Sequence, residues 1–108
     1  ETDHISVRVD AGDPLCEVTL RSFVIGAVHQ GLGMVRSEGV AVDEDGEVQD
    51  LTIRSFGILT ASQMPAVEVA IEGSGPARPA GVAVFAATLA AAWVQAGRPP
   101  AWPIRANL

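Results

Sequence analysis

The stretch GSGPARPAGVAVFAATLAAAWVQA, residues 73–96, decides how the rest of the chain is arranged. It begins with a glycine-rich turn after an alternating, strand-like run, and it continues as the most apolar helix that the sequence predicts. Free backbone N–H groups point outward where a strand leads through a turn into a helix, so ligands often bind there. The turn is therefore the candidate site, and the helix, residues 81–96, belongs to the candidate core.

Composition and charge limit the classes of protein to which the chain can belong. With 108 residues, of which 48% are hydrophobic, it has the length and apolar content of a single small domain, residues 1–108. The formal net charge of −6 argues against nucleic acid and anionic membranes as partners, since both require a basic surface. The apolar run is shorter than the roughly 20 residues that span a bilayer, so we interpret it as a buried helix.

The cysteine content indicates a cellular compartment. Cys16 is the single cysteine, so an internal disulfide is impossible, which favours a reducing, cytoplasmic location. The alternating apolar residues around it predict a strand and a buried, inert thiol. No signal peptide is visible, and because the first residue is Glu1 rather than methionine, we expect that the native start has been trimmed.

Hydrophobic periodicity predicts a hairpin followed by a helix in the first third of the chain. Residues 4–10 alternate apolar and polar side chains, and after a turn residues 15–20 are expected to return as a second strand. Ser22 then caps a helix over residues 23–36. Each glycine in that helix costs about 1 kcal/mol relative to alanine, which indicates the close approach of another backbone or of a ligand. These glycines are Gly26, Gly31 and Gly33.

The middle of the chain is expected to contain short strands and turns. Residues 39–42 and 47–48 are interpreted as strands, and residues 51–56 as strand or irregular chain. The acidic run at residues 43–46 fits a hairpin turn better than a calcium loop, because the ligand spacing of such a loop is missing. Two further predictions concern the approach to the glycine-rich turn: a turn or single helical turn at 60–65 and a strand at 66–72.

This order of elements predicts an α+β fold. We expect a mainly antiparallel sheet of about five strands with two helices packed on one face. The helix of residues 81–96 is apolar nearly all round, so it has more apolar surface than one sheet face can cover. The excess predicts burial in a homodimer or against a partner chain.

The side chains suited to catalysis are few. His4 and His29 stand apart from other potential ligands, and no His, Cys, Asp or Glu cluster has the spacing of a metal site. Neither a nucleotide-binding glycine motif nor a nucleophile motif is present. The residues therefore predict no catalytic group and no metal site.

The glycine-rich turn nevertheless has the composition of a site for a small anion. The backbone N–H groups of its glycines and the guanidinium of Arg78 are suited to hold a phosphate or a carboxylate. The candidate binding residues are Gly73, Ser74, Gly75 and Arg78.

Residues 24–40, VIGAVHQGLGMVRSEGV, resemble a helix and following strand of the molybdenum hydroxylases, the xanthine dehydrogenase and aldehyde oxidase family. The similar region is the C-terminal part of the molybdopterin-binding subunit. ILTASQMP, residues 58–65, resembles a later segment of that subunit, and an alternating strand, a glycine-rich turn and an alanine-rich helix follow in the family's order. The resemblance extends over roughly residues 24–97 and implies a domain that contributes to a molybdopterin site.

The resemblance also implies departures from a working catalytic site. In the family, the glycine-rich turn approaches the pterin and carries a glutamate that acts as the catalytic base. Alignment of Pro79 with the family's prolines places Arg78 at that glutamate, and an arginine stays protonated near neutral pH. Ser22 and Phe23 stand where the family has a glycine–glutamine pair whose glutamine binds the cofactor.

Three hypotheses about function follow. The favoured one is a stand-alone, non-catalytic relative of the molybdopterin-binding domain that acts as an accessory or interaction domain and binds no cofactor by itself. In the second, the chain is the small subunit of a split oxidoreductase and binds molybdopterin only when assembled with other subunits. In the third, it binds a small anion at the turn that runs from Gly73 to Arg78.

Overall fold

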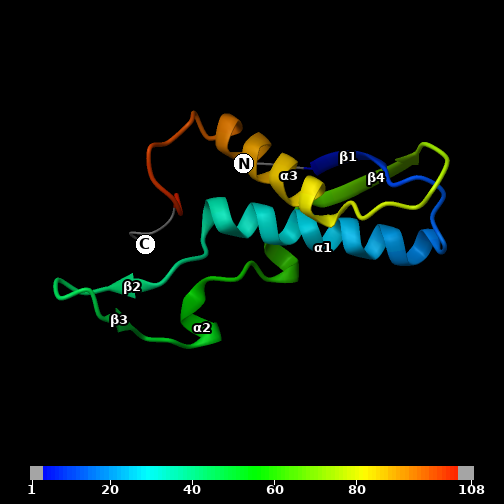
Figure 1. Ribbon diagram of the computed structural model, residues 1–108. Coiled ribbons are helices and arrows are strands. Elements are labelled where there is room, and N and C mark those ends of the chain that lie inside the picture. The colour runs from blue at the N-terminus through cyan, green and yellow to red at the C-terminus, as the bar shows by residue number, and fades with distance from the viewer. Residues whose placement is uncertain (1–3, 105–108) are drawn as a thin grey trace.

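The computed structural model describes residues 4–104, which form a two-layer body and a projecting arm (Figure 1). In chain order the elements are β1 (His4–Asp10), α1 (Glu17–Arg36), β2 (Ala41–Val42), β3 (Val48–Gln49), α2 (Ile53–Phe56), the 3-10 helix η1 (Ala61–Gln63), β4 (Ala66–Glu72) and α3 (Gly81–Gln95). The body consists of β1, β4, α1 and α3, while β2, β3 and α2 belong to the arm.

The sheet of the body has two parallel strands, β1 and β4. Their register runs from His4 opposite Ala66 to Asp10 opposite Glu72, which confirms the strands predicted at residues 4–10 and 66–72. Alternate side chains face the helices, as the period of a half-buried strand requires. These inward residues are Ile5, Val7, Val9, Val67, Val69 and Ile71.

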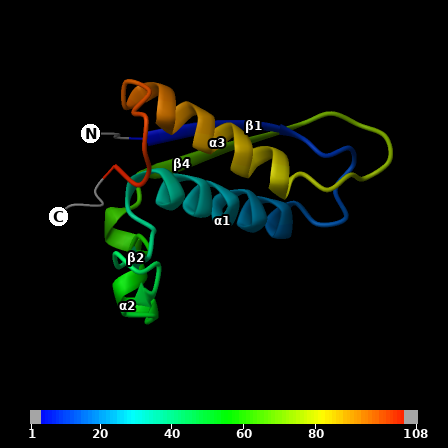
Figure 2. The same cartoon turned by 60° about the vertical axis from the view of Figure 1, so that its left-hand side comes forward.

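The two long helices pack side by side on the inner face of this sheet. α1 contacts β4, and α3 lies nearer to β1 (Figure 2). The apolar stripe of α1 forms the centre of the core because its members recur at helical spacing. Its largest fully buried side chains are Val24, Val28, Leu32 and Val35.

The helix glycines differ in what surrounds them. A Cβ added to Gly31 would meet the Phe85 carbonyl oxygen of α3 at 2.8 Å, so the two helix backbones approach closely at this point. The expectation of close packing is therefore confirmed at Gly31. Gly26, in contrast, has nothing within 4 Å of such a Cβ and faces open space.

The predicted fold class is wrong. Residues 4–104 contain three α-helices and four strands, which form one parallel and one antiparallel two-stranded sheet instead of an antiparallel sheet of about five strands. The main cause is the segment from residue 15 to residue 20, which is not the second strand of a hairpin. Because α1 follows β1 directly and crosses over before β4, the strands of the body pair in parallel.

The start of α1 explains this error. The helix begins at Glu17 with Cys16 as its N-cap, so Ser22 lies inside the helix instead of capping it. Leu20 continues the stripe of Val24 and Val28 one turn towards the N-terminus, and a single acidic residue in the first turn suits the helix dipole. Cys16 is exposed, which overturns the prediction of a buried thiol.

α3 has the predicted extent but is less buried than predicted. It runs from Gly81 to Gln95 and is followed by Gly97, whose φ of 86° suits the glycine after a helix. Only Val84, Thr88 and Ala92 are buried among its residues, so most of its alanine surface is exposed. Within residues 4–104, no helix combines the length and the apolar character needed to cross a membrane.

The arm, residues 40–58, projects from the end of α1 (Figures 1 and 2). Its antiparallel pairing of β2 with β3 confirms the predicted hairpin at the acidic turn, where the Asp43 carboxylate accepts hydrogen bonds from the backbone N–H groups of Asp45 and Glu47. Residues 51–56 contain the short helix α2 and no strand. The segment at 60–65 contains η1, as predicted.

Candidate functional site

The glycine-rich turn connects β4 to α3 and lies against the loop between β1 and α1. Gly73 and Gly75 have φ values of 91° and 94°, a left-handed conformation that glycine adopts without a steric penalty. The structure thus places the predicted residues Gly73, Ser74, Gly75 and Arg78 within one turn. Whether they bind a ligand stays a prediction.

Backbone groups of the turn are hydrogen-bonded to the neighbouring loop. The Gly75 N–H donates to Asp13 Oδ2 at 3.1 Å, and the Asp13 N–H donates back to the Gly75 carbonyl at 2.9 Å. The Arg78 N–H donates to the Ala11 carbonyl at 2.8 Å. The two loops are therefore joined, and the N–H groups of Gly75 and Arg78 already have acceptors within the chain.

The guanidinium of Arg78 is paired with a carboxylate. Arg78 Nη2 lies 2.9 Å from Asp10 Oδ1, and the same oxygen accepts the Gly12 N–H at 3.0 Å. The Gly12 hydrogen bond, reinforced by the charge of Arg78, lowers the pKa of Asp10 below its ordinary value. Both side chains are more than half exposed, so the ion pair contributes little to stability.

These contacts define what the turn can do chemically. Arg78 remains protonated near neutral pH and has no lone pair with which to accept a proton. Asp10 can accept a proton in principle, but its lowered pKa makes it a weaker base than an ordinary carboxylate. An incoming anion would compete with Asp10 for the guanidinium, because the two groups carry the same charge.

A second feature is an apolar hollow of about 530 Å³ between α1 and the segment before β4. His29 Nε2 lies 2.7 Å from the Leu59 carbonyl oxygen and links its two walls. Ser22 lies on the wall formed by α1, together with the open position at Gly26. The remaining lining residues are Ile25, Ala61, Met64, Pro65 and Val67.

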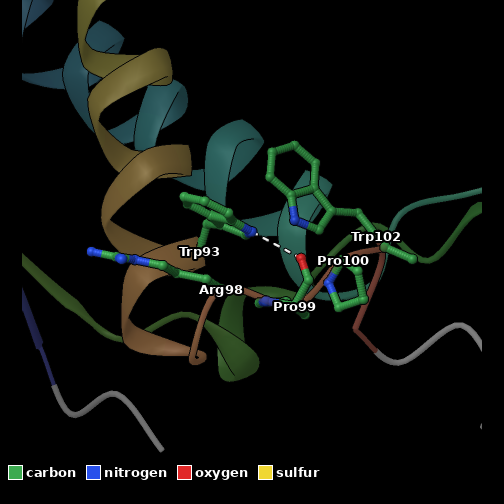
Figure 3. Close-up of a pocket in the computed structure, with 6 residues that line it drawn as sticks. Trp93, Arg98, Pro99, Pro100 and Trp102 are labelled. Atoms are coloured by element: carbon green, nitrogen blue, oxygen red, sulfur yellow. Dashed lines mark hydrogen bonds between the residues drawn. The ribbon is translucent and has the colours of Figure 1, made fainter.

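A third feature is a hollow of about 370 Å³ at the C-terminal end of α3 (Figure 3). Trp93 Nε1 donates a hydrogen bond to the Pro99 carbonyl at 2.9 Å, which folds the chain back after the helix. Figure 3 shows the Trp102 indole beyond this carbonyl and the Arg98 side chain extending away from Trp102. The lining is therefore aromatic and proline-rich, with the guanidinium at its margin.

The chain is similar to proteins of a known family. A family model described as the molybdopterin cofactor-binding domain matches residues 1–65. The chain belongs to this family. The resemblance to the molybdenum hydroxylases that the sequence indicated is therefore confirmed. No curated protein matches the chain.

Two solved structures contain the same fold as this molybdopterin cofactor-binding domain. Quinoline 2-oxidoreductase from Pseudomonas putida 86 matches 80% of the chain with a TM-score of 0.72 and 18% sequence identity. The Cu,Mo-CO dehydrogenase, in its carbon monoxide reduced state, matches 78% with a TM-score of 0.70 and 17% identity. The matched segment is only 12% and 11% of those chains, so the chain corresponds to a small part of each enzyme.

The family implies molybdopterin, but the turn of this chain does not fit the cofactor. A molybdopterin carries an anionic phosphate, and a turn that holds such a group offers free N–H donors and positive charge. Here the N–H groups of Gly75 and Arg78 are already bonded, and the carboxylates of Asp10 and Asp13 lie against the turn. Across the part of the chain that the structure describes, no three His, Cys, Asp or Glu side chains gather in a way that could hold a metal ion.

The sequence predicts the glycine-rich turn but does not indicate that the loop between β1 and α1 lies against it. The sequence pattern predicts Asp10 at the end of a strand and Asp13 in a turn, and it assigns neither residue to the site. The parallel pairing of β1 with β4 brings the ends of both strands to the same edge, which places these carboxylates beside the turn. A prediction that these two strands pair in parallel would have placed Asp10 and Asp13 beside the turn.

Proposed function

We propose that the chain is a non-catalytic relative of the molybdopterin cofactor-binding domain that acts through contact with another polypeptide. One observation carries the proposal: the resemblance places Arg78 at the position of the catalytic base, and its guanidinium is paired with the Asp10 carboxylate. Arg78 stays protonated near neutral pH, and the lowered pKa of Asp10 makes its carboxylate a weaker base than an ordinary one. A cytoplasmic location fits the single cysteine.

The arm supports the contact with another polypeptide. All of its residues are exposed except Gly57, although it contains many large apolar side chains. An exposed apolar segment of this kind is typical of a protein–protein contact. Its exposed apolar residues are Val40, Val42, Val48, Leu51, Ile53, Phe56 and Ile58.

The test is to produce the chain in cells that synthesise the molybdenum cofactor and to measure metal, pterin and activity. We expect the purified chain to contain neither molybdenum nor pterin and to leave quinoline unoxidised in the presence of an electron acceptor. Stoichiometric molybdenum together with turnover of quinoline would overturn the proposal. Arg78→Glu, which supplies a carboxylate at the position of the base, is the matched variant for the same assay.

A second candidate function, the small subunit of a split oxidoreductase, is favoured by the match in fold. Most of this chain superimposes on about one-eighth of a molybdenum enzyme, so a companion chain would have to supply the rest of the site. Purification of the chain with its native partner distinguishes the two functions. A complex that contains molybdenum and pterin supports the split enzyme, whereas a complex without either supports the accessory role.

A further inference from the structure

The outer edge of β1 is the feature from which a further inference can be drawn. β1 and β4 pair over seven residues, and within residues 4–104 their sheet has no third strand. Each strand therefore has one edge without a neighbouring strand. A seven-residue edge directs the N–H and C=O groups of alternate residues outward, which makes it suitable for pairing with another strand.

The two free edges differ in what borders them. On β4, Arg21 Nη1 donates a hydrogen bond to the Val69 carbonyl at 2.6 Å, so a side chain of α1 lies over this strand. β1 instead borders a groove of about 430 Å³ that separates it from α3. The strand contributes residues 5–10 to one wall of this groove.

The opposite wall is a stripe of methyl groups on α3. Ala83, Ala87 and Ala91 recur every four residues, line the groove and are exposed. Such small side chains leave room for a second element to approach the helix closely, and they are on the same side of the body as the free edge of β1. A strand added at this edge would therefore also contact the alanine methyl groups of α3.

We propose that a second copy of this chain occupies this edge, with the two β1 strands antiparallel across a two-fold axis at Val7. In this register the inward residues are apolar on both sides, since Ile5 lies opposite Val9 of the other copy. On the outward face His4 lies opposite Asp10, whose carboxylate can accept a hydrogen bond from the imidazole, and Ser6 lies opposite Arg8. The edge is thus complementary to itself, as a two-fold interface requires.

Neighbouring registers are less favourable because they oppose like charges or shorten the pairing. Moving the axis to Arg8 would place two arginines directly opposite each other, and moving it to Ser6 would leave Val9 and Asp10 without partners in β1 of the other copy. Like charges at directly opposed positions are destabilising. The register centred on Val7 avoids the pair of arginines and keeps all seven residues of β1 in the ladder.

The proposed dimer also completes the architecture of each chain. Two strands form a marginal sheet, and pairing of the β1 strands gives a four-stranded sheet in the order β4, β1, β1, β4. The two α3 helices then lie next to each other beneath it, with their alanine stripes in contact. This dimer goes beyond the role proposed above, because it forms whether or not the arm binds a different polypeptide and whether or not the turn is catalytic.

Sedimentation equilibrium tests the interface. We expect the wild-type chain, 11.2 kDa as a monomer, to be dimeric at about 50 μM, and Ala87→Glu to raise the dissociation constant at least tenfold because it places charge in the groove. Ala86→Glu is the matched control: Ala86 is exposed and is not part of the groove, so this variant should remain dimeric. A monomeric wild type, or equal weakening by both substitutions, would overturn the proposal.

Disulfide trapping tests the register independently of that variant. In a Cys16→Ser background, chains with Ser6→Cys are mixed with chains with Arg8→Cys, at two exposed positions on the outward face. We expect the mixed disulfide between the two variants to predominate. A predominance of Ser6→Cys homodimers or of Arg8→Cys homodimers would place the axis elsewhere, and the absence of any cross-link would contradict strand pairing.

Discussion

At the scale of single residues, the turn that contains Arg78 is joined to the loop between β1 and α1 by an ion pair and backbone hydrogen bonds. Asp10 lies at the end of β1 and pairs with a residue 68 positions later. The pair combines a cation that stays protonated near neutral pH with a weakly basic carboxylate. The chemistry of the turn therefore depends on two residues that only the fold brings together.

The hypothesis of a small-anion site makes a prediction about this pair. Asp10→Asn removes the competing carboxylate, so we expect it to bind inorganic phosphate more tightly than the wild type, by about fivefold or less, as for exposed ion pairs. Arg78→Ala should abolish the heat of binding in isothermal titration. Equal, negligible heats for all three proteins would reject the anion site.

The contact at Gly31 makes a prediction about stability. Gly31→Ala forces Cβ against the Phe85 carbonyl, so we expect a loss of about 1–3 kcal/mol in the free energy of unfolding. Gly26→Ala is the matched control, because open space surrounds that position and alanine raises helix propensity by about 1 kcal/mol. Urea denaturation measures both changes, and a Gly31→Ala protein as stable as Gly26→Ala would contradict the close approach.

Cys16 makes a prediction about pH dependence. A hydrogen bond to the Thr19 side chain lowers the pKa of the Cys16 thiol, with a further contribution from the Thr19 backbone N–H. The thiolate is therefore populated at a lower pH than for an ordinary cysteine. We expect Thr19→Val to raise this pKa, so that the pH profile of alkylation by iodoacetamide shifts to higher pH. An unshifted profile would show that Thr19 has no such role.

At the scale of elements, α1 and the arm differ in how their apolar residues are used. The stripe of α1 is almost completely buried, with Val28 and Val35 fully inaccessible. In the arm, side chains of similar hydropathy are exposed because only two short strands and one helical turn support them. The sequence pattern does not distinguish the buried apolar residues of α1 from the exposed ones of the arm, since each segment contains several large apolar residues.

The exposure of the arm predicts that its apolar residues contribute little to the folding of the isolated chain. Leu51 and Ile53 are 74% and 80% exposed, so we expect Leu51→Ser with Ile53→Ser to change the free energy of unfolding by about 0.5 kcal/mol or less. The same double variant should reduce the fluorescence of bound anilinonaphthalene sulfonate, a dye that binds apolar surface. Leu32→Ser, in the core, is the contrasting variant and should lower stability strongly. A large loss of stability in the arm variant would show that the arm packs on the body.

At the scale of the whole molecule, the body and the arm are connected through a narrow base. The Gly39 N–H donates to the Phe56 carbonyl at 2.9 Å, and Ser37 Oγ donates to the Gly57 carbonyl at 2.6 Å. Neither of the two buried clusters of the core includes a residue of the arm, and Leu59, which belongs to one of them, directly follows the arm. The sheet and the two long helices therefore account for the buried core without the arm.

This separation predicts that the arm can be removed. Replacement of residues 40–56 by two glycines should keep the body folded, because hydrogen bonds from Gly39 to Phe56 and from Ser37 to Gly57 show that the two ends to be joined are close together. We expect a single cooperative thermal transition, with circular dichroism that retains the helical signal of α1 and α3. Loss of the cooperative transition would show that the arm is required for folding.

Local features could be predicted from the sequence, since each depends on neighbours in the chain. The alternation at residues 4–10 and 66–72 predicted both strands of the body correctly, and Gly97 marks the predicted end of α3. The resemblance also predicted the family correctly. The prediction of a strand from Leu15 to Leu20 is wrong because the apolar residues of this segment fit a strand period and also extend the helical stripe of α1.

The sequence by itself determined the strands of the body, the long helices and the glycine-rich turn. Only the tertiary structure decided that β1 and β4 pair in parallel, that Asp10 and Asp13 lie against the turn, and that the edge of β1 borders an alanine groove on α3. The physical reason is that periodicity and turn chemistry act over a few residues. Strand direction and the charge around a turn depend on contacts between residues more than sixty positions apart.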